Sequence, residues 1–254
     1  MKRLALFFML LPGLAYASVS GMDDINPNIP VETQEKLDEA ITTYYQHPSV
    51  QQVDTVLDIM NDSDLLRKKT AWPPMVGFLT VIFENNKEHL FDWMARNDYN
   101  QYAQDVFISA LLHAKLKETA LVFAQAHQWK KDELENLQHT WDDVDLKQLE
   151  VTAPGHIDTL WGAFFASGDV VYVNEIINVL LRDEMPFSPD SLIGASYNLL
   201  KEDKKLAENT LRQYAPYHEP VRRALSARIA AEKDTTKKQL LQRILRSGSH
   251  SDKK

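Results

Sequence analysis

The chain has 254 residues, a formal net charge of −8 and no cysteine. An acidic chain repels phosphate backbones and anionic lipid, so nucleic acid and anionic membrane surfaces are poor candidate partners. The lack of cysteine excludes disulfides, thiolate zinc sites and a cysteine nucleophile. The fold must therefore be held by burial of apolar side chains, which a chain of this length can provide.

Residues 1–17 have the pattern of a secretory signal peptide. Two basic residues precede an apolar run at 4–14, and residues 15–17 read Ala-Tyr-Ala, a small-x-small cleavage site. The run is short for a membrane span, so we expect cleavage rather than an uncleaved anchor. The mature chain would begin near Ser18 and be periplasmic or secreted, without stable membrane insertion.

After the signal, residues 18–30 are polar and rich in turn-forming residues, and we expect an extended leader. Apolar residues at helical spacing then predict a helix over 31–46, which the His47-Pro48 pair ends because the residue before proline avoids the helical region. Ser49 can cap a second helix over 50–60, and the two would form a hairpin.

Trp72-Pro73-Pro74 predicts the start of a third helix, since proline is tolerated in a first helical turn. The almost unbroken apolar run at 75–83 predicts that this helix is central and buried. Asn85-Asn86 ends it, and a further helix is expected over 87–97. Helices at 99–114 and 116–129 follow, with alanines that allow close approach.

The stretch at 157–181 predicts two short helices joined by one tight turn. Gly168 is placed to end the first helix in the left-handed conformation, and Asp169 is placed to cap the second. When 72–86 is laid over this stretch, Gly77 falls on Gly162, which indicates a weak internal repeat.

The remaining segments are less regular. Short helices are expected around 131–137 and 145–149, and a loop at 185–189. Four further helices are predicted towards the C-terminus, at 190–201, 204–214, 219–233 and 235–245.

The fold class predicted from these patterns is all-α, with about eleven helices in antiparallel hairpins that form an irregular, solenoid-like array. No run shows the alternation that a half-buried strand needs. Residues 31–246 are expected to form a single domain, and 247–254 a disordered tail.

Aromatic and histidine residues are the first candidates for a site. Four of the five tryptophans lie in or beside apolar stripes, which favours core packing, whereas Trp141 has acidic neighbours and is expected to be exposed. His113 and His127 lie near the ends of paired helices. No metal-ligand spacing accompanies them, so partly buried histidines are favoured over a metal site.

Acidic residues are the second candidates. Asp142, Asp143 and Asp145 lack the glycine and glutamate of a calcium loop, which favours a solvated acidic loop. No Gly-x-Ser-x-Gly or phosphate-binding loop occurs. Three glutamates near the aromatic helices, any of which could act as a lone general acid, are Glu84, Glu88 and Glu175.

Two blocks, WPPMVGFLTVIFENN at 72–86 and LWGAFFASGDVVYVNEIINVL at 160–180, resemble an uncharacterised group of bacterial secreted all-helical proteins. The paired helices are also loosely similar to tetratricopeptide and Sel1-type repeats, although the regular 34-residue period is absent. The resemblance implies a secreted helical protein and carries over no activity, cofactor or site residue.

No catalytic, cofactor-binding or metal-ligating residue is assigned from the sequence. We expect a non-enzymatic helical protein that serves as a protein–protein interaction or scaffold module, with a protein partner in the cell envelope. Two alternatives stay open: a helical enzyme that cleaves cell-wall glycan, and a protein that binds a small apolar ligand between its helices.

Overall fold

The computed structural model describes residues 30–62, 64–96, 98–133, 135, 145–183 and 193–247, with no side-chain description for Val31 and 193–200. These residues form helices and short 3-10 turns with no strand among them, which confirms the all-α class and the expected number of about eleven helices. No helix in this part of the chain combines the length and the apolar character that crossing a membrane requires.

The first half of the chain forms three successive helical hairpins. Their helices are α2 (Val31–Thr42), α3 (Val50–Asp62), α4 (Trp72–Asn85), α5 (Lys87–Met94), α6 (Gln101–His113) and α7 (Lys117–Ala126). Short 3-10 turns lie between them at η1 (Tyr44–Gln46), η2 (Asp64–Arg67) and η3 (Lys69–Ala71). The segment between α3 and α4 is thus largely 3-10 helical.

The second half continues with a fourth hairpin and three further helices. The elements are η4 (Leu146–Gln148), α9 (Pro154–Ser167), α10 (Val170–Leu181), α11 (Ile193–Tyr214), α12 (Glu219–Ala231) and α13 (Thr235–Ser247). Residues 131–133 and 135 are also helical, and the rest of the helix expected at 131–137 lies outside the described residues, as does the loop expected at 185–189. Ser247, placed in the tail by the sequence, is the last residue of α13.

Local signals position several helix ends as predicted. Pro73 and Pro74 occupy the first turn of α4, and the side chain of Ser49 accepts a hydrogen bond of 3.2 Å from the backbone of Gln52 at the start of α3. Gly168 ends α9 with φ of +70°, a left-handed conformation that favours glycine. Asp169 then caps α10 by accepting from Val171 N at 3.0 Å.

The break predicted within the C-terminal half was wrong, whereas the helices expected at 31–46, 87–97 and 116–129 are only shorter than predicted. The helices expected at 190–201 and 204–214 are a single helix, α11, of 22 residues. No proline or glycine lies between Lys201 and Lys204 to break it, and Asp203, between the two expected helices, is only 2% exposed.

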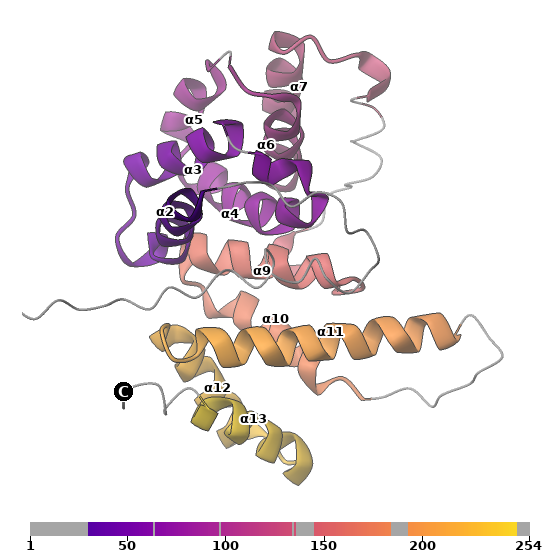
Figure 1. The fold of residues 1–254 in the computed structure, drawn as a ribbon. Helices are drawn as coiled ribbons and strands as arrows, with labels where there is room; N and C mark the ends of the chain where they lie inside the picture. The colour runs from indigo at the N-terminus through magenta and orange to yellow at the C-terminus, as the bar shows by residue number, and fades with distance from the viewer. Residues whose placement is uncertain are drawn as a thin grey trace, which may run out of the picture.

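Helices α4 and α9 form the centre of the molecule. Figure 1 shows them against each other, with α2, α3, α5, α6 and α7 on one side and α10 to α13 on the other. Both helices are buried along most of their circumference, as the apolar run at 75–83 predicts. Helix α9 therefore packs on a helix from a hairpin that is not its neighbour in sequence, and the array is not a linear solenoid.

Two glycines allow this crossing. A Cβ atom built on Gly77 would lie 2.0 Å from the carbonyl oxygen of Thr159, and one built on Gly162 would lie 2.0 Å from the carbonyl oxygen of Pro74. The contacts are reciprocal: Gly77 meets Thr159, three residues before Gly162, and Gly162 meets Pro74, three residues before Gly77. These are the two glycines that the internal alignment superposes, so the predicted repeat pairs the residues that meet at the crossing.

Substitution of Gly77 by Ala should destabilise the protein by about 3 kcal/mol, because the added methyl group meets backbone atoms that cannot move without separating α4 from α9. An exposed helical glycine would instead gain up to about 1 kcal/mol from the same change. Urea unfolding followed by circular dichroism measures the difference.

Gly155→Ala is the matched control, because its Cβ atom would meet only the side chain of Pro73, at 3.2 Å. We expect this variant to stay within about 1 kcal/mol of the wild-type protein. A Gly77→Ala variant as stable as Gly155→Ala would show that the two helices do not depend on backbone contact.

Candidate functional site

A stripe of three residues runs along the side of α9 that faces α11. Asp158, Trp161 and Phe165 lie at i, i+3 and i+7, so they share one face of the helix. This face packs towards α11, because Trp161 and Phe165 both contact the ring of Tyr214. Asp158 is the only charged residue of α9, and it lies one turn before a buried tryptophan.

The rings around this stripe form a continuous aromatic cluster. Trp161 and Tyr214 have ring centroids 4.6 Å apart, and Phe165 lies 5.0 Å from Tyr214 and 5.8 Å from Trp161. The cluster extends through Phe164 to Tyr45 of η1, at 5.3 Å. Residues from α9, α11 and η1 are therefore held in fixed positions by ring packing.

His218, in the turn before α12, closes the cluster on one side. It is buried, and its Nδ1 atom lies 3.0 Å from the hydroxyl oxygen of Tyr45, at hydrogen-bond distance. Burial, helped by the nearby positive charge of Arg222, lowers the pKa of His218 to about 4. The imidazole is thus neutral at pH 7 and adds no positive charge to the cluster.

The electrostatics of the stripe are set by carboxyl groups. Burial raises the pKa of Asp158 to about 7, and no hydrogen bond or opposite charge from the described residues offsets it. Part of the residue remains exposed, so the carboxyl group is enclosed without being sealed. Burial raises the pKa of Tyr214 as well, and the negative charges of Asp158 and Asp38 raise it further.

The indole nitrogen of Trp161 is the second unusual polar group of the stripe. The residue is 3% exposed, and its Nε1 atom has no hydrogen-bond partner among the described residues. Buried N–H groups are paired in the large majority of cases. We refer to Asp158, Trp161 and Tyr214 as the α9–α11 cluster.

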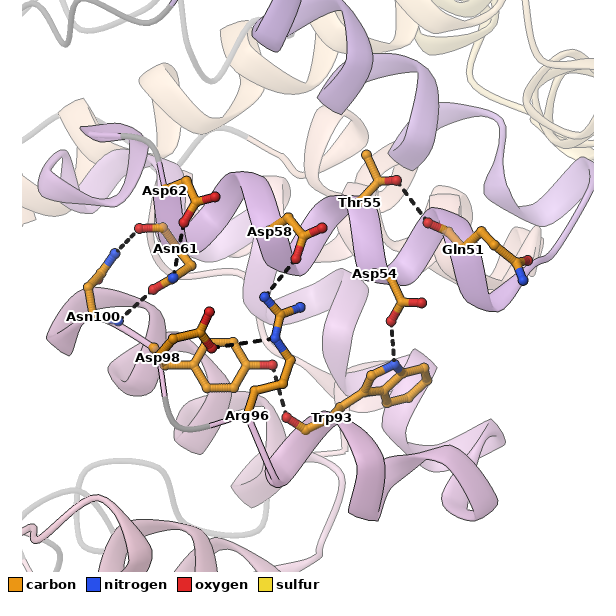
Figure 2. A network of polar contacts seen from close by, with 11 residues as sticks. Gln51, Asp54, Thr55, Asp58, Asn61, Asp62, Trp93, Arg96, Asp98 and Asn100 are labelled. Atoms are coloured by element: carbon orange, nitrogen blue, oxygen red, sulfur yellow. Dashed lines mark hydrogen bonds and ion pairs between the residues drawn. The ribbon is translucent and has the colours of Figure 1, made fainter.

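A second group of polar residues joins α3 to α5 and to the connection between α5 and α6 (Figure 2). Arg96 Nη2 lies 2.6 Å from Asp58 Oδ1, and the indole of Trp93 donates to Asp54 at 3.0 Å. Asn100 donates from its backbone and side chain to Asn61.

The carboxylates and amide of this network satisfy donors from the connection, and Asn100 in turn caps α6 by accepting from Ala103 N at 3.0 Å. Figure 2 shows Asp54, Asp58 and Asn61 of α3 directed at Trp93, Arg96 and Asn100. The network therefore fixes the start of α6 on α3, and we assign it a structural role.

The tryptophans lie mostly where the sequence predicts. Trp93 and Trp161 are buried, and Trp72 and Trp129 are half-buried. The indole groups of Trp72 and Trp129 donate to Leu66 O and Gln104 Oε1, each at 2.7 Å, which confirms core packing for these residues. Trp141 lies outside the described residues.

The histidine candidates are also part of the core. His113 is buried at the end of α6, and half-buried His127 packs with its ring centroid 4.4 Å from that of Phe123. Burial lowers the pKa of His127. Within the described part of the chain, no group of three residues has the arrangement of a metal site.

The acidic candidates are dispersed. Glu84 and Glu88 are exposed at the junction of α4 and α5, and Glu175 is half-buried on α10 beside Asn178. Burial and the charge of Asp145 raise the pKa of Glu84.

Of the three aspartates in the acidic segment, Asp145 is described and caps η4 by accepting from Lys147 N at 2.9 Å. Asp142 and Asp143 lie outside the described residues. The residue that sequence reasoning missed is Asp158. Its signal was present, since it is a single carboxylate in an otherwise apolar helix one turn from a tryptophan.

The fold and the site define an all-α protein built of helical hairpins around a crossed central pair, with a half-buried carboxyl group beside an aromatic cluster. Comparison with protein-family models, with curated proteins and with solved structures found no match for the chain.

Substitution of Asp158 by Asn should stabilise the protein at pH 8 and not at pH 4. The folded pKa of Asp158 is raised, so its protonated form contributes stability below about pH 4 that is lost as the pH rises through about 7. The amide cannot ionise, and we expect the variant to be more stable by about 2 kcal/mol at pH 8. Three full pKa units would give roughly 4 kcal/mol, and the partial exposure of the residue reduces this.

Urea unfolding of both proteins between pH 4 and pH 8 measures this difference. His218 has the opposite dependence, because its lowered pKa causes a loss of stability as the pH falls from about 6.5 to 4. The contribution of His218 is the same in the wild-type protein and in Asp158→Asn, so it cancels in the difference between their free energies of unfolding. The contributions of Asp38 and Tyr214 cancel in the same way to a first approximation. If the difference in free energy of unfolding between the two proteins does not change with pH, the carboxyl group of Asp158 is solvated and the prediction is contradicted.

Proposed function

We propose that the protein is a non-enzymatic interaction module of the cell envelope, exported through its N-terminal signal sequence and bound to a protein partner through the outer side of α5. The observation that carries the proposal is the exposure of Phe91. Its side chain is 76% exposed, the most of the four exposed large hydrophobic residues that the described part of the chain contains.

The local sequence explains why Phe91 faces outwards. Leu90 and Trp93 are buried and fix the inner side of α5, and the polar network around Trp93 holds the helix on α3. Phe91 is then rotated onto the outer side beside the exposed acidic residues Glu88 and Asp92. An aromatic side chain within a polar rim is the composition of a protein–protein hot spot.

The position of α5 in the fold also supports a binding surface on its outer side. Figure 1 shows it at the periphery, on the side of the molecule away from α10 to α13. A partner that contacts this helix would leave the central α4–α9 pair undisturbed. Export to the envelope is proposed from the basic, apolar and small-x-small pattern of residues 1–17.

A photo-crosslinking amino acid placed at position 91 tests this function in intact cells. We expect one reproducible crosslinked protein from position 91 and none from position 217, because Tyr217 is also exposed, at 52%, but lies in the turn before α12. Truncation of an interface hot spot costs about 2 kcal/mol or more, so Phe91→Ala should reduce recovery of that protein at least tenfold.

Circular dichroism of Phe91→Ala provides the folding control, and an exposed residue should leave it unchanged. Equal crosslinking from positions 91 and 217, or full recovery of the partner with Phe91→Ala, would contradict the assignment of the α5 surface.

A further inference from the structure

The net charge of the chain is unevenly distributed. Residues 219–247, which form α12, α13 and their connection, contain eight basic and three acidic residues, a net charge of +5, although the whole chain has −8. The rest of the chain therefore carries −13. The whole-chain charge argues against anionic partners, but that argument averages over two regions of opposite sign.

The three acidic side chains of this region are held by the protein itself. Glu219 lies 3.7 Å from Arg223, and Glu232 lies 3.5 Å from Arg228, so both carboxylates neutralise basic residues of α12. Asp234 caps the start of α13 by accepting two backbone N–H groups, at 2.8 and 3.0 Å. None of the three neutralises the middle or the end of α13.

Four basic side chains have no acidic partner within the described part of the chain. We refer to them as the basic α13 face, and they are Lys233, Lys238, Arg243 and Arg246. The first lies in the connection before α13. At about 100° per residue, the other three project from one side of the helix, opposite to the buried Leu241 and Ile244.

The basic α13 face lies at one end of the molecule. Helix α13 packs on α11 and α12, and Figure 1 shows it at the opposite end from α5, α6 and α7, with α9, α10 and α11 in between. Packed helices are separated by about 8–10 Å each, whereas the Debye length is about 8 Å at physiological ionic strength. The acidic residues of the first hairpins are therefore screened from an anionic surface that approaches α13.

The composition of the region indicates which anionic partner it fits. Residues 219–247 contain no aromatic side chain, so they offer neither the aromatic anchor typical of a protein–protein hot spot nor a platform on which nucleic-acid bases stack. The apolar side of α13 is covered by the protein, which leaves charge as the available attraction. A fluid bilayer needs no anchor, because its anionic headgroups attract a basic cluster by charge alone.

We propose that the basic α13 face docks the protein onto an anionic bilayer, with its four basic side chains against phospholipid headgroups and without insertion of the helix. The proposal is independent of the partner-binding role of α5, because Phe91 belongs to a different hairpin. A protein docked in this way presents α5 on the side away from the membrane, where a partner can reach it (Figure 1).

Sedimentation of the purified protein with vesicles tests this docking. We expect binding to vesicles of equal parts phosphatidylglycerol and phosphatidylcholine, and none to phosphatidylcholine alone. A basic residue near an anionic surface contributes about fivefold to the affinity, so the double variant Arg243→Gln/Arg246→Gln should bind at least tenfold more weakly.

The double variant Lys130→Gln/Lys131→Gln is the matched control. It removes the same charge from two exposed residues that follow α7, and we expect its binding to be unchanged. Equal weakening by the two double variants would overturn the proposal, because it would show a response to net charge without a defined face.

Ionic strength separates docking by charge from insertion. The Debye length falls to about 3 Å at 1 M salt, so binding to the anionic vesicles should be lost there. Binding that persists at 1 M salt would overturn the proposal in favour of an inserted apolar segment. This comparison uses the wild-type protein, so it keeps its force if the Arg243→Gln/Arg246→Gln variant fails to fold, which circular dichroism measures.

An acidic protein is the competing occupant of this face. A photo-crosslinking amino acid at position 243 that captures such a protein, in the absence of any sedimentation with anionic vesicles at low salt, would overturn the lipid assignment. Absence of vesicle binding alone would also overturn it. Neither result bears on crosslinking from position 91, so the α5 surface is tested separately.

Discussion

The fold depends on backbone contact between α4 and α9 at Gly77 and Gly162. Each of these helices has little polar surface, so neither is stable in water unless it is covered on nearly every side. The glycines bring the two helices close enough to cover each other, and the hairpins then add side-chain layers above and below. In the absence of cysteine, the stability of the fold comes from this burial and not from disulfides.

The same crossing determines where a polar group can be tolerated. With one face of α9 fixed against α4, Asp158 and Trp161 lie on the neighbouring face, where ring packing with Tyr214 and Phe165 holds Trp161 in the core and Asp158 stays half-buried. A well-packed core can absorb the cost of one unsatisfied group such as the indole N–H of Trp161, and such exceptions to local rules concentrate at functional sites. The polar network on α3 contrasts with this cluster, because its groups satisfy one another.

Much of the fold could be predicted from sequence because its signals are local. Pro73, Gly168 and Asp169 each mark a helix end through contacts within a few residues, and apolar spacing identified the inward faces. The break expected near Lys201 was wrong: no helix-breaking residue lies there, and Asp203 is buried within the continuous helix α11. Asp158 was missed although its local signal was present, because its closeness to Tyr214 of α11 comes from a contact between segments remote in sequence.

The most direct test of the central pair is native-state hydrogen exchange under increasing denaturant. If α4 and α9 form one cooperative unit, their interior amides will exchange with the same free energy, equal to that of global unfolding, and higher than that of α5 or α13. Exchange of α9 through a partial opening that leaves α4 protected would contradict the account, because it would show that neither helix needs the other to remain folded.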